Sequence, residues 1–285
     1  MMTVSPRPAD SAGTPSARLD LGTFLPTSTP DPAQPILGDI GAAARLAEEL
    51  GLDSVWSTDH LVASAPILDS TVALATAAAV TERIRIGWGV LVVSLRPAAW
   101  AAKQAATLQY TSGNRLLLGV GTGNPAHSDI AWRAADQPHA ERGRRTDEAL
   151  RVLPDLIAGR PAVLADGTEV TLSPGASVPP ILVAGNGSRA MRRAAAYADG
   201  WLAIGLSPDE SALAATELAD LADAVNRPAP QITIVTPPTG DLAQTVDTVS
   251  AHAAANVERV ILAPADPDWR AHYEFAAKVK AALPS

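Results

Sequence analysis

Eight short apolar runs, each followed by a segment with helical spacing, set the rhythm of this chain. We predict strands at residues 19–25, 54–56, 84–92, 115–120, 181–184, 201–204, 231–236 and 259–262. The run 84–92 carries apolar side chains on both faces, as strands of a parallel sheet do when helices cover the sheet on both sides. Eight strand–helix units predict a (β/α)8 TIM barrel, a fold that typically takes about 250 residues. An open doubly wound sheet is the alternative, but it needs a switch point, and no segment marks one.

Three segments depart from this rhythm. Residues 161–178 hold two short apolar runs around Asp166-Gly167, which is typical of a hairpin turn, so we expect a hairpin excursion after the fourth helix. Residues 126–145 are polar, and we expect them to be irregular. Residues 1–18 are rich in Pro, Ser, Ala and Gly and predict a disordered N-terminal tail. The remainder, residues 19–285, is predicted to form a single barrel domain.

The composition excludes several classes of function. The net charge of −8 and the presence of only 3 Tyr and 2 Phe argue against nucleic-acid binding, because an acidic surface repels phosphates and few rings can stack on bases. The absence of cysteine excludes disulfides, Cys-bound zinc and thiol nucleophiles, and it fits a cytoplasmic location. No segment reaches the roughly 18–20 apolar residues that span a bilayer, so we expect no membrane insertion. No HExxH pattern or carboxylate cluster predicts a metal site.

The first candidate for chemistry is the pair Asp59-His60, which comes just after the predicted strand 54–56. Barrel enzymes carry their catalytic residues at the C-terminal ends of the strands. An imidazole beside a carboxylate can transfer protons near neutral pH. The alternative is a capping aspartate next to a structural histidine. We favour the catalytic interpretation because the pair lies at the end of an apolar strand.

Glycine-rich segments are the next candidates. The run Gly119-Val-Gly-Thr-Gly-Asn124 lets a flat ligand or a backbone come close, although a tight turn explains it equally well. In the run from Gly185 to Ser188, free backbone N–H groups before a helix suit a phosphate, and three arginines follow at positions 189–193. A glycine turn with a serine N-cap is the alternative there. Gly87-Trp88-Gly89 lies inside a strand, where glycine suggests a bulge, an unusual peptide or a close ligand.

The other four histidines are weaker candidates. His252 and His272 are expected on outer helices, where a structural or solvated role is usual. His127 and His139 fall in the polar segment after the fourth strand, from which they could reach the mouth of the barrel. No Gly-x-Ser-x-Gly elbow indicates a hydrolase.

Six stretches follow one another in the order of a known superfamily. They are AEELGLDSVWSTDH (47–60), TERIRIGWGVLV (81–92), AAKQAATL (101–108), SGNRLLLGVGTGN (112–124), AERGRRTDEALRVL (140–153) and PPILVAGNGSRAMRRAAAYADGW (179–201). Together they resemble the bacterial luciferase-like superfamily of flavin and deazaflavin oxidoreductases over most of residues 19–201. The Thr-Asp-His tip and the Gly-Val-Gly-Thr-Gly run look most like the branch that uses the deazaflavin coenzyme F420.

The resemblance implies roles for the candidate residues. The residues that would border the deazaflavin ring are Asp59, Gly89, Val90, Thr122, Gly123 and Asn124. The residues that would hold the ribityl phosphate are Gly185, Asn186, Gly187 and Ser188. A non-prolyl cis peptide between Gly89 and Val90 would back the ring. His60, with Asp59 beside it, would be the proton donor or acceptor next to the site of hydride transfer.

The resemblance also implies a function: an F420-dependent oxidoreductase that transfers a hydride between the deazaflavin and a small organic substrate. An FMN-dependent monooxygenase, which consumes oxygen and takes reduced flavin from a reductase partner, is the first alternative. A non-catalytic flavin-binding protein is the second. Members of the family are habitually dimers, so we expect a homodimer.

Two departures from the family limit the expected substrate. Asn124 stands where the sugar-phosphate dehydrogenases carry a glutamate, and Ser64 stands where they carry a tryptophan. Glucose-6-phosphate activity is therefore not expected. The walls of the substrate site are predicted to come from three loops, at residues 26–35, 61–68 and 126–139.

Overall fold

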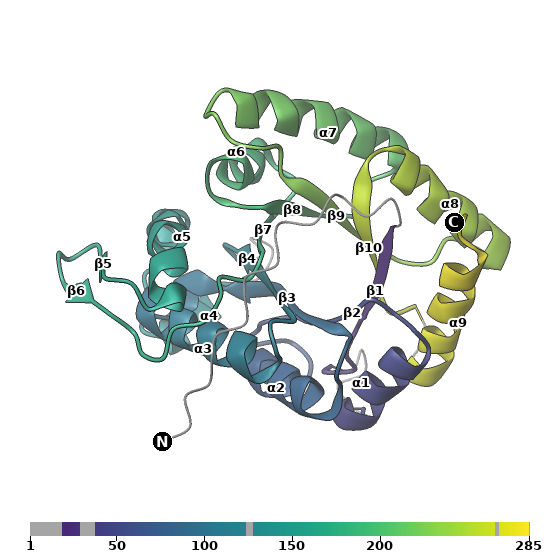
Figure 1. Cartoon of the computed structure of the whole chain (residues 1–285), viewed down its shortest axis with the longest axis horizontal. Helices are drawn as coiled ribbons and strands as arrows, with labels where there is room; N and C mark the ends of the chain where they lie inside the picture. The colour runs from purple at the N-terminus through teal and green to yellow at the C-terminus, as the bar shows by residue number, and fades with distance from the viewer. Residues whose placement is uncertain (1–18, 29–37, 124–127, 266–267, 285) are drawn as a thin grey trace, which may run out of the picture.

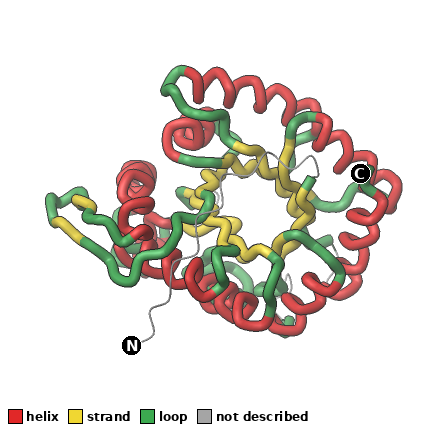
Figure 2. Tube along the Cα trace, viewed as in Figure 1, coloured by secondary structure: helices red, strands yellow, loops and turns green. Residues whose placement is uncertain are grey.

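A computed structural model of the chain describes residues 19–28, 38–123, 128–265 and 268–284. Within these residues, eight parallel strands close into a barrel in the order β1-β10-β9-β8-β7-β4-β3-β2. Helices surround the barrel on the outside (Figures 1 and 2). The predicted TIM barrel is therefore confirmed. The tail predicted at residues 1–18 lies outside the described residues.

The elements match the predicted rhythm. The barrel strands are β1 (Asp20–Phe24), β2 (Ser54–Ser57), β3 (Arg85–Val92), β4 (Leu116–Gly121), β7 (Ile181–Ala184), β8 (Gly200–Ile204), β9 (Gln231–Thr236) and β10 (Val257–Leu262). The helices that pack on them are α1 (Ile40–Glu49), α2 (Ser70–Val80), α3 (Ala98–Thr111), α5 (Arg142–Ala158), α6 (Ser188–Tyr197), α7 (Pro208–Asp223), α8 (Leu242–Ala254) and α9 (Trp269–Ala282). Every predicted strand overlaps a strand of the barrel and differs from it only at the ends.

Local chemistry explains where the helices begin and end. The Asp39 side chain accepts a hydrogen bond from the backbone N–H of Ala42 and caps α1, as a capping carboxylate does. Gly51 follows α1 with a φ of +77°, a conformation that only glycine adopts without cost. Asp69 caps α2 in the same way as Asp39 caps α1. These short-range contacts fix the residues at which α1 begins and ends and at which α2 begins.

The polar segment after β4 is more ordered than its composition predicts. In its described part, the chain forms a short helix, α4 (Ile130–Ala134), then the 3-10 turn η2 (His139–Glu141), and α5 begins at Arg142. The prediction of irregular structure is wrong there because one apolar side chain, Trp132, anchors the segment. Trp132 is 4% exposed and packs near Val92 and Leu95 at the end of β3. The predicted hairpin is confirmed as β5 (Ala162–Val163) paired antiparallel with β6 (Glu169–Val170).

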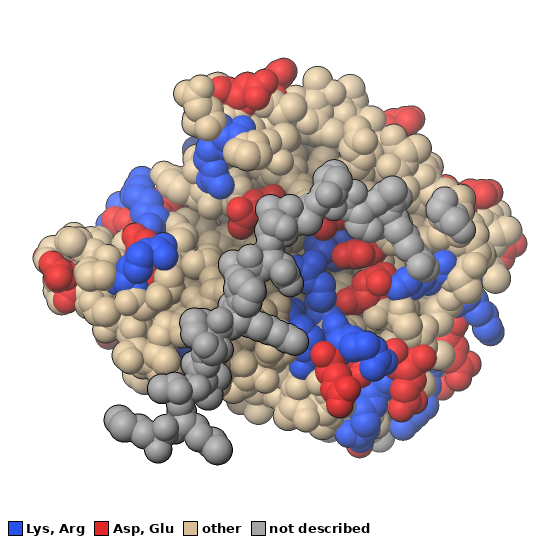
Figure 3. Space-filling view, in the orientation of Figure 1, with Lys and Arg blue, Asp and Glu red and all other residues tan. Residues whose placement is uncertain are grey.

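The barrel is filled, and its N-terminal end is closed by charges. Arg259, near the start of β10, is only 3% exposed and pairs with Asp20 at 2.9 Å and with Glu258 at 3.2 Å. On the face shown in Figure 3, acidic and basic side chains lie intermixed around the barrel axis. Above this layer, an apolar cluster fills the interior with Trp56, Leu117, Leu182, Leu202, Val235 and Ile261. The candidate catalytic and binding residues lie at the opposite end, where the strands terminate.

Candidate functional site

The tip of β2 is tied to the end of β3 by the Asp59 carboxylate. Its Oδ2 accepts hydrogen bonds from the backbone N–H of Val92 at 2.9 Å and from Arg96 Nη2 at 2.7 Å. Its Oδ1 accepts one from Ser70 Oγ at 3.1 Å, and Ser70 in turn accepts one from Trp88 Nε1 at 3.1 Å. Three donors hold a carboxylate that is only 5% exposed. These contacts fix the position of the next residue in the chain, His60.

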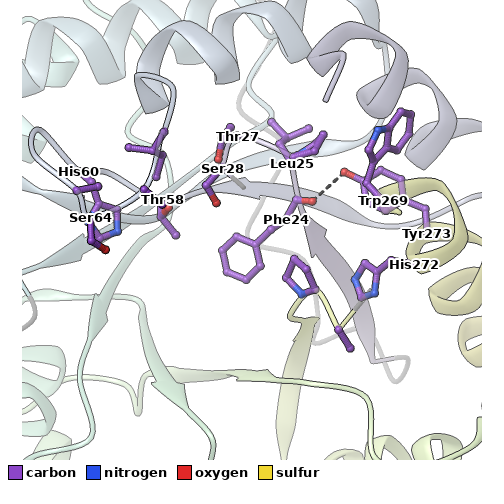
Figure 4. Close-up of a pocket in the computed structure, with 16 residues that line it drawn as sticks. Phe24, Leu25, Thr27, Ser28, Thr58, His60, Ser64, Trp269, His272 and Tyr273 are labelled. Carbon is purple, nitrogen blue, oxygen red and sulfur yellow. Dashed lines mark hydrogen bonds between the residues drawn. The ribbon is translucent and has the colours of Figure 1, made fainter. Parts of the chain in front are cut away.

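His60 is half-buried and borders a cavity of about 620 Å³ at the C-terminal end of β1, β2 and β10. In Figure 4, His60 lies with Ser64 on one side of this cavity, and His272 and Tyr273 lie on the other. The residues that line it are Phe24, Leu25, Pro26, Thr27, Ser28, Thr58, His60, Ala63, Ser64, Ala65, Ile67, Pro264, Ala265, Trp269, His272 and Tyr273. Two of the three loops predicted as walls contribute, but no described residue of the third loop does.

The far wall of the cavity was missed by the sequence reasoning, because it comes from α9. Tyr273 donates a hydrogen bond from its hydroxyl to the Phe24 carbonyl at 2.8 Å, and its ring meets Trp269 edge to face at 5.4 Å. His272 Nε2 lies 3.0 Å from Thr23 Oγ1. His272 is 3% exposed, so the structural role expected for it has contacts to support it, whereas a solvated role is wrong. The closure of the barrel could have predicted this wall. Because β10 pairs with β1, the helix after β10 begins beside the tip of β1.

The peptide between Gly89 and Val90 is cis, as the resemblance implies. The pairing of β3 with β4 shifts register at this point. Two glycines of β4 make room for it: a Cβ on Gly119 would lie 2.1 Å from the Trp88 carbonyl oxygen, and one on Gly121 would lie 2.5 Å from Val90 Cγ2. Of the alternatives for the glycine run, a close backbone approach therefore holds for Gly119, whereas Gly121 makes room for the Val90 side chain.

The cis peptide also adjoins the cavity, through one aromatic ring. A Cβ built on Gly89 would lie 3.3 Å from Phe24 Cε1, and Phe24 is a lining residue of the cavity. Gly87, two residues earlier, leaves space for the indole of Trp56, which a Cβ would approach to 2.4 Å. The glycines of β3 thus let two aromatic rings pack against the strand: Phe24, which lines the cavity, at Gly89, and Trp56 of the barrel interior at Gly87.

At the tip of β7, the Asn186 side chain clamps two strands together. Its Nδ2 donates to the Ile204 carbonyl at 2.7 Å, and its Oδ1 accepts from the Ile204 N–H at 3.0 Å. Both ends of the amide are therefore engaged by the last residue of β8. A direct contact of this side chain with a ligand is not what the geometry favours.

The next helix, α6, begins without a side-chain cap. Its N-cap is Gly187, which has no side chain to offer, and Ser188 is the first helical residue, so the serine N-cap considered as an alternative does not form. A Cβ on Gly187 would meet nothing within 4 Å, so the space in front of the helix is open. Uncapped N–H groups at a helix N-terminus attract anions. This end of α6 therefore fits a phosphate.

The predicted residues lie along one arc of the barrel mouth. Asp59 and His60 follow β2, the cis peptide lies in β3, Thr122 and Gly123 follow β4, and Gly185 follows β7; these four strands are consecutive neighbours in the barrel. Among the predicted residues that the structure describes, only His60 also lines the cavity. Asn124 and His127 lie outside the described residues, so the roles predicted for them stay predictions.

The described part of the chain contains neither a metal-binding cluster nor a membrane-spanning helix. No group of three His, Asp or Glu side chains there could hold a metal ion. None of the helices described has the length and apolar character needed to cross a bilayer.

Comparison with known proteins agrees with this geometry. A family model described as luciferase-like monooxygenase matches residues 19–280. The chain is 39% identical over 150 residues to an uncharacterized protein of Mycobacterium tuberculosis, covering 51% of each chain. It is 35% identical over 180 residues to an F420-dependent glucose-6-phosphate dehydrogenase of Beutenbergia cavernae, covering 58% of this chain and 52% of that one. It is 33% identical over 146 residues to a 4-hydroxyprotoasukamycin monooxygenase of Streptomyces nodosus subsp. asukaensis, covering 50% and 38%.

The chain thus spans about half the length of the curated relatives that it matches. Among solved structures, it is similar to an F420-dependent secondary alcohol dehydrogenase in complex with an F420–acetone adduct. The TM-score is 0.79 at 16% identity, and the match covers 94% of this chain and all of that one. At this identity the likeness shows a shared fold.

Proposed function

The chain belongs to the luciferase-like monooxygenase family, and on this basis we propose that it is an F420-dependent oxidoreductase acting on a small organic substrate. The observation that carries the proposal is the position of His60. Its imidazole borders the cavity, and its neighbour Asp59 is bonded to the end of β3, the strand that contains the cis peptide. A group able to transfer protons therefore borders the cavity and adjoins the arc that we assign to the cofactor ring.

The arc fits a flat ring that carries a phosphate. We propose that the cis peptide Gly89–Val90 backs the ring and that Thr122 and Gly123 lie at its edge, because all four residues are partly exposed at the mouth. The open, uncapped start of α6 at Gly187 would bind the phosphate. A deazaflavin bound there supplies a carbon that accepts or donates a hydride, and the protein supplies binding and orientation.

His60 completes the reaction at the substrate oxygen. When a hydroxyl-bearing carbon loses its hydride, the hydroxyl proton has to leave as the carbonyl forms, and we propose that the His60 imidazole takes it. In the reverse direction the same imidazole returns the proton. Asp59 was predicted as the second catalytic residue; with its carboxylate held by three donors, we propose that it acts by positioning His60.

A binding titration tests the proposal. The purified chain is titrated with F420 and, in parallel, with FMN, and bound cofactor is measured by fluorescence quenching. We expect F420 to bind with a Kd of about 1–10 μM and FMN at least about tenfold more weakly. Turnover of a suitable substrate would then bleach the visible absorbance of F420. The absence of any F420 binding would overturn the proposal.

An FMN-dependent monooxygenase is the second candidate, and the relative from Streptomyces nodosus favours it. This function requires FMN to bind more tightly than F420. It also requires a partner reductase to supply reduced flavin, and it consumes oxygen. An oxygen electrode with FMN and a generic flavin reductase distinguishes the two candidates, because a deazaflavin dehydrogenase needs no oxygen.

For the assembly we propose a homodimer. What supports it is that the neighbouring helices α2 and α3 carry three large exposed apolar side chains: Val72 is 66% exposed, Trp100 66% and Tyr110 71%. Exposed apolar side chains gathered on adjacent elements are typical of interfaces. Light scattering after size exclusion measures the mass, and a monomer of 29.3 kDa would contradict this proposal.

A further inference from the structure

The cavity beside His60 has an unusual lining for an enzyme mouth: its described walls contain no Asp, Glu, Lys or Arg. Its polar groups are the hydroxyls and imidazoles of Thr27, Ser28, Thr58, His60, Ser64 and His272, besides the phenol of Tyr273 and the indole of Trp269. The Tyr273 hydroxyl is already engaged by Phe24. The remaining lining side chains are apolar, so the described surface offers hydroxyls, imidazoles and hydrocarbon.

Two charged groups adjacent in sequence to lining residues are engaged elsewhere. The Asp59 carboxylate is paired with Arg96 at the end of β3, and neither residue lines the cavity. The Arg270 guanidinium lies over the Trp269 ring, 4.1 Å from its centroid, and does not line the cavity either. A phosphate or carboxylate in the cavity would therefore lose its water without gaining a lysine or arginine partner from the described lining, which is unfavourable.

The proposed proton-transfer group and the largest ring lie at opposite ends of the cavity. Figure 4 shows His60, Ser64 and Thr58 on one side, Phe24 in the middle, and Trp269 with His272 on the opposite side. A volume of about 620 Å³ lies within the range of pockets that bind drug-sized molecules. The cavity therefore suits a molecule with a sizeable apolar body and a polar atom at one end.

We propose that this cavity is the substrate compartment and that the substrate is uncharged, with an aromatic or aliphatic body and one hydroxyl or carbonyl oxygen placed at His60. The body packs between Phe24 and Trp269. The assignment as a substrate compartment rests on the proposed oxidoreductase function, whereas the selection against charge rests on the lining alone. An uncharged substrate would differ from that of the Beutenbergia cavernae relative, whose name specifies a sugar phosphate.

A matched pair of probes tests the selection against charge. The first is 4-phenylbutan-2-one, and the second is 4-(3-oxobutyl)benzoate, which has the same body and ketone plus a carboxylate. Each is titrated into the chain by calorimetry, first without cofactor and then with saturating F420. We expect the neutral ketone to bind at least about tenfold more tightly than the carboxylate in both series.

The outcomes separate this inference from the proposed function. Tighter binding of the ketone without any F420 binding would support the neutral lining and overturn the oxidoreductase proposal alone. Equal or tighter binding of the carboxylate would overturn the inference. Displacement of the ketone by F420 would also overturn it, because the cavity would then belong to the cofactor.

One variant tests the location. Ala65→Lys adds a cation to the lining, and we expect it to weaken binding of the ketone and to strengthen binding of the carboxylate, each by about tenfold. Ala212→Lys, on the exposed face of α7, is the matched control and should change neither. Thermal melts confirm that both variants fold. If the affinities of folded Ala65→Lys equal those of the control, the probes bind elsewhere and the inference fails.

Discussion

The carboxylate of Asp59 and the guanidinium of Arg96 form a largely buried ion pair, with 2.7 Å between Oδ2 and Nη2. The two side chains are 5% and 19% exposed. Asp59 directly precedes His60, and Arg96 follows the 3-10 turn η1 (Val93–Leu95) at the end of β3. The pair therefore joins the loop that carries the imidazole to the strand that carries the cis peptide.

The first prediction concerns this pair. Asp59→Asn keeps the size of the side chain but leaves Arg96 without its counter-charge in a site that is mostly closed to water. We expect a loss of about 2–4 kcal/mol in the free energy of unfolding, somewhat less than for a fully buried pair because Arg96 keeps some contact with solvent. Urea denaturation measures it. The matched control is Asp129→Asn, which breaks an exposed pair with Arg133 and should have little effect. A similar loss in both variants would contradict the prediction.

The second prediction concerns His60. His60→Ala should lower kcat by about 10²–10⁴-fold, because a general acid or base contributes about that much to a proton transfer. The Kd of F420 should change little, since the imidazole is assigned to the substrate side. Steady-state kinetics and fluorescence titration measure the two quantities, with Val62→Ala as a control on the same loop, because Val62 is 40% exposed and does not line the cavity. Unchanged turnover in the His60 variant would remove the proposed role of the imidazole in proton transfer.

The fold was predictable because its signals are local. Each strand is a short apolar run, and helices begin at side chains such as Asp39 that cap their own first turn. Trp132 was the exception: its burial depends on β3, which lies far away in the sequence. Without that partner in view, a polar segment predicts irregular structure.

The positions of the candidate residues were predictable only where these residues follow the strand tips. The arc from His60 to Gly185 could be placed, because parallel strands end at the same side of a barrel. The cavity wall could not, since Tyr273 contacts Phe24 across 249 residues of sequence. Gly119 could not be explained from the sequence for the same reason. Only glycine fits there because the Trp88 carbonyl of the neighbouring strand fills the space of a side chain.

The third prediction concerns the glycine in β3 that faces Trp56. Gly87→Ala would place a methyl group 2.4 Å from an indole ring that is fully buried and has no room to move. Overpacking of this kind costs about 1–3 kcal/mol, and we expect a lower Tm together with weaker cofactor binding. Gly143→Ala in α5 is the control, because its methyl group would come no closer than 3.8 Å to another element, at Arg193 Nη2. Equal melting temperatures for the two variants would show that the barrel interior relaxes around position 87.

The fourth prediction separates stability from binding at the start of α6. Ser188→Asp adds a negative charge where the helix has no cap, which should raise stability by about 0.3–1 kcal/mol. The same charge should repel the cofactor phosphate and weaken F420 binding, by about tenfold or more. Ala243→Asp, in the first turn of α8, is the control and should leave the Kd unchanged. Unaltered F420 affinity in the Ser188 variant would place the phosphate elsewhere.

The fifth prediction concerns His252, a histidine of α8 that faces α7. It is fully buried, its Nδ1 lies 3.2 Å from Ser211 Oγ, and its Nε2 has no hydrogen-bond partner. Burial lowers the pKa of His252 below its ordinary value, because a charged imidazole would lose its water without gaining a partner. The folded chain therefore holds this side chain neutral.

The sign of the pH effect follows from that lowered pKa. In the unfolded chain the imidazole binds a proton near pH 6.5, so the stability that His252 contributes is fully present above about pH 6.5 and is lost as the pH falls toward the folded pKa. The loss has an upper limit of about 1.4 kcal/mol for each pH unit in that window. His252→Gln cannot titrate there, and its Tm should fall less between pH 7.5 and pH 5.5 than the Tm of the parent chain. Differential scanning fluorimetry measures both slopes, and equal slopes would mean that protons reach His252 without opening the contact between α7 and α8.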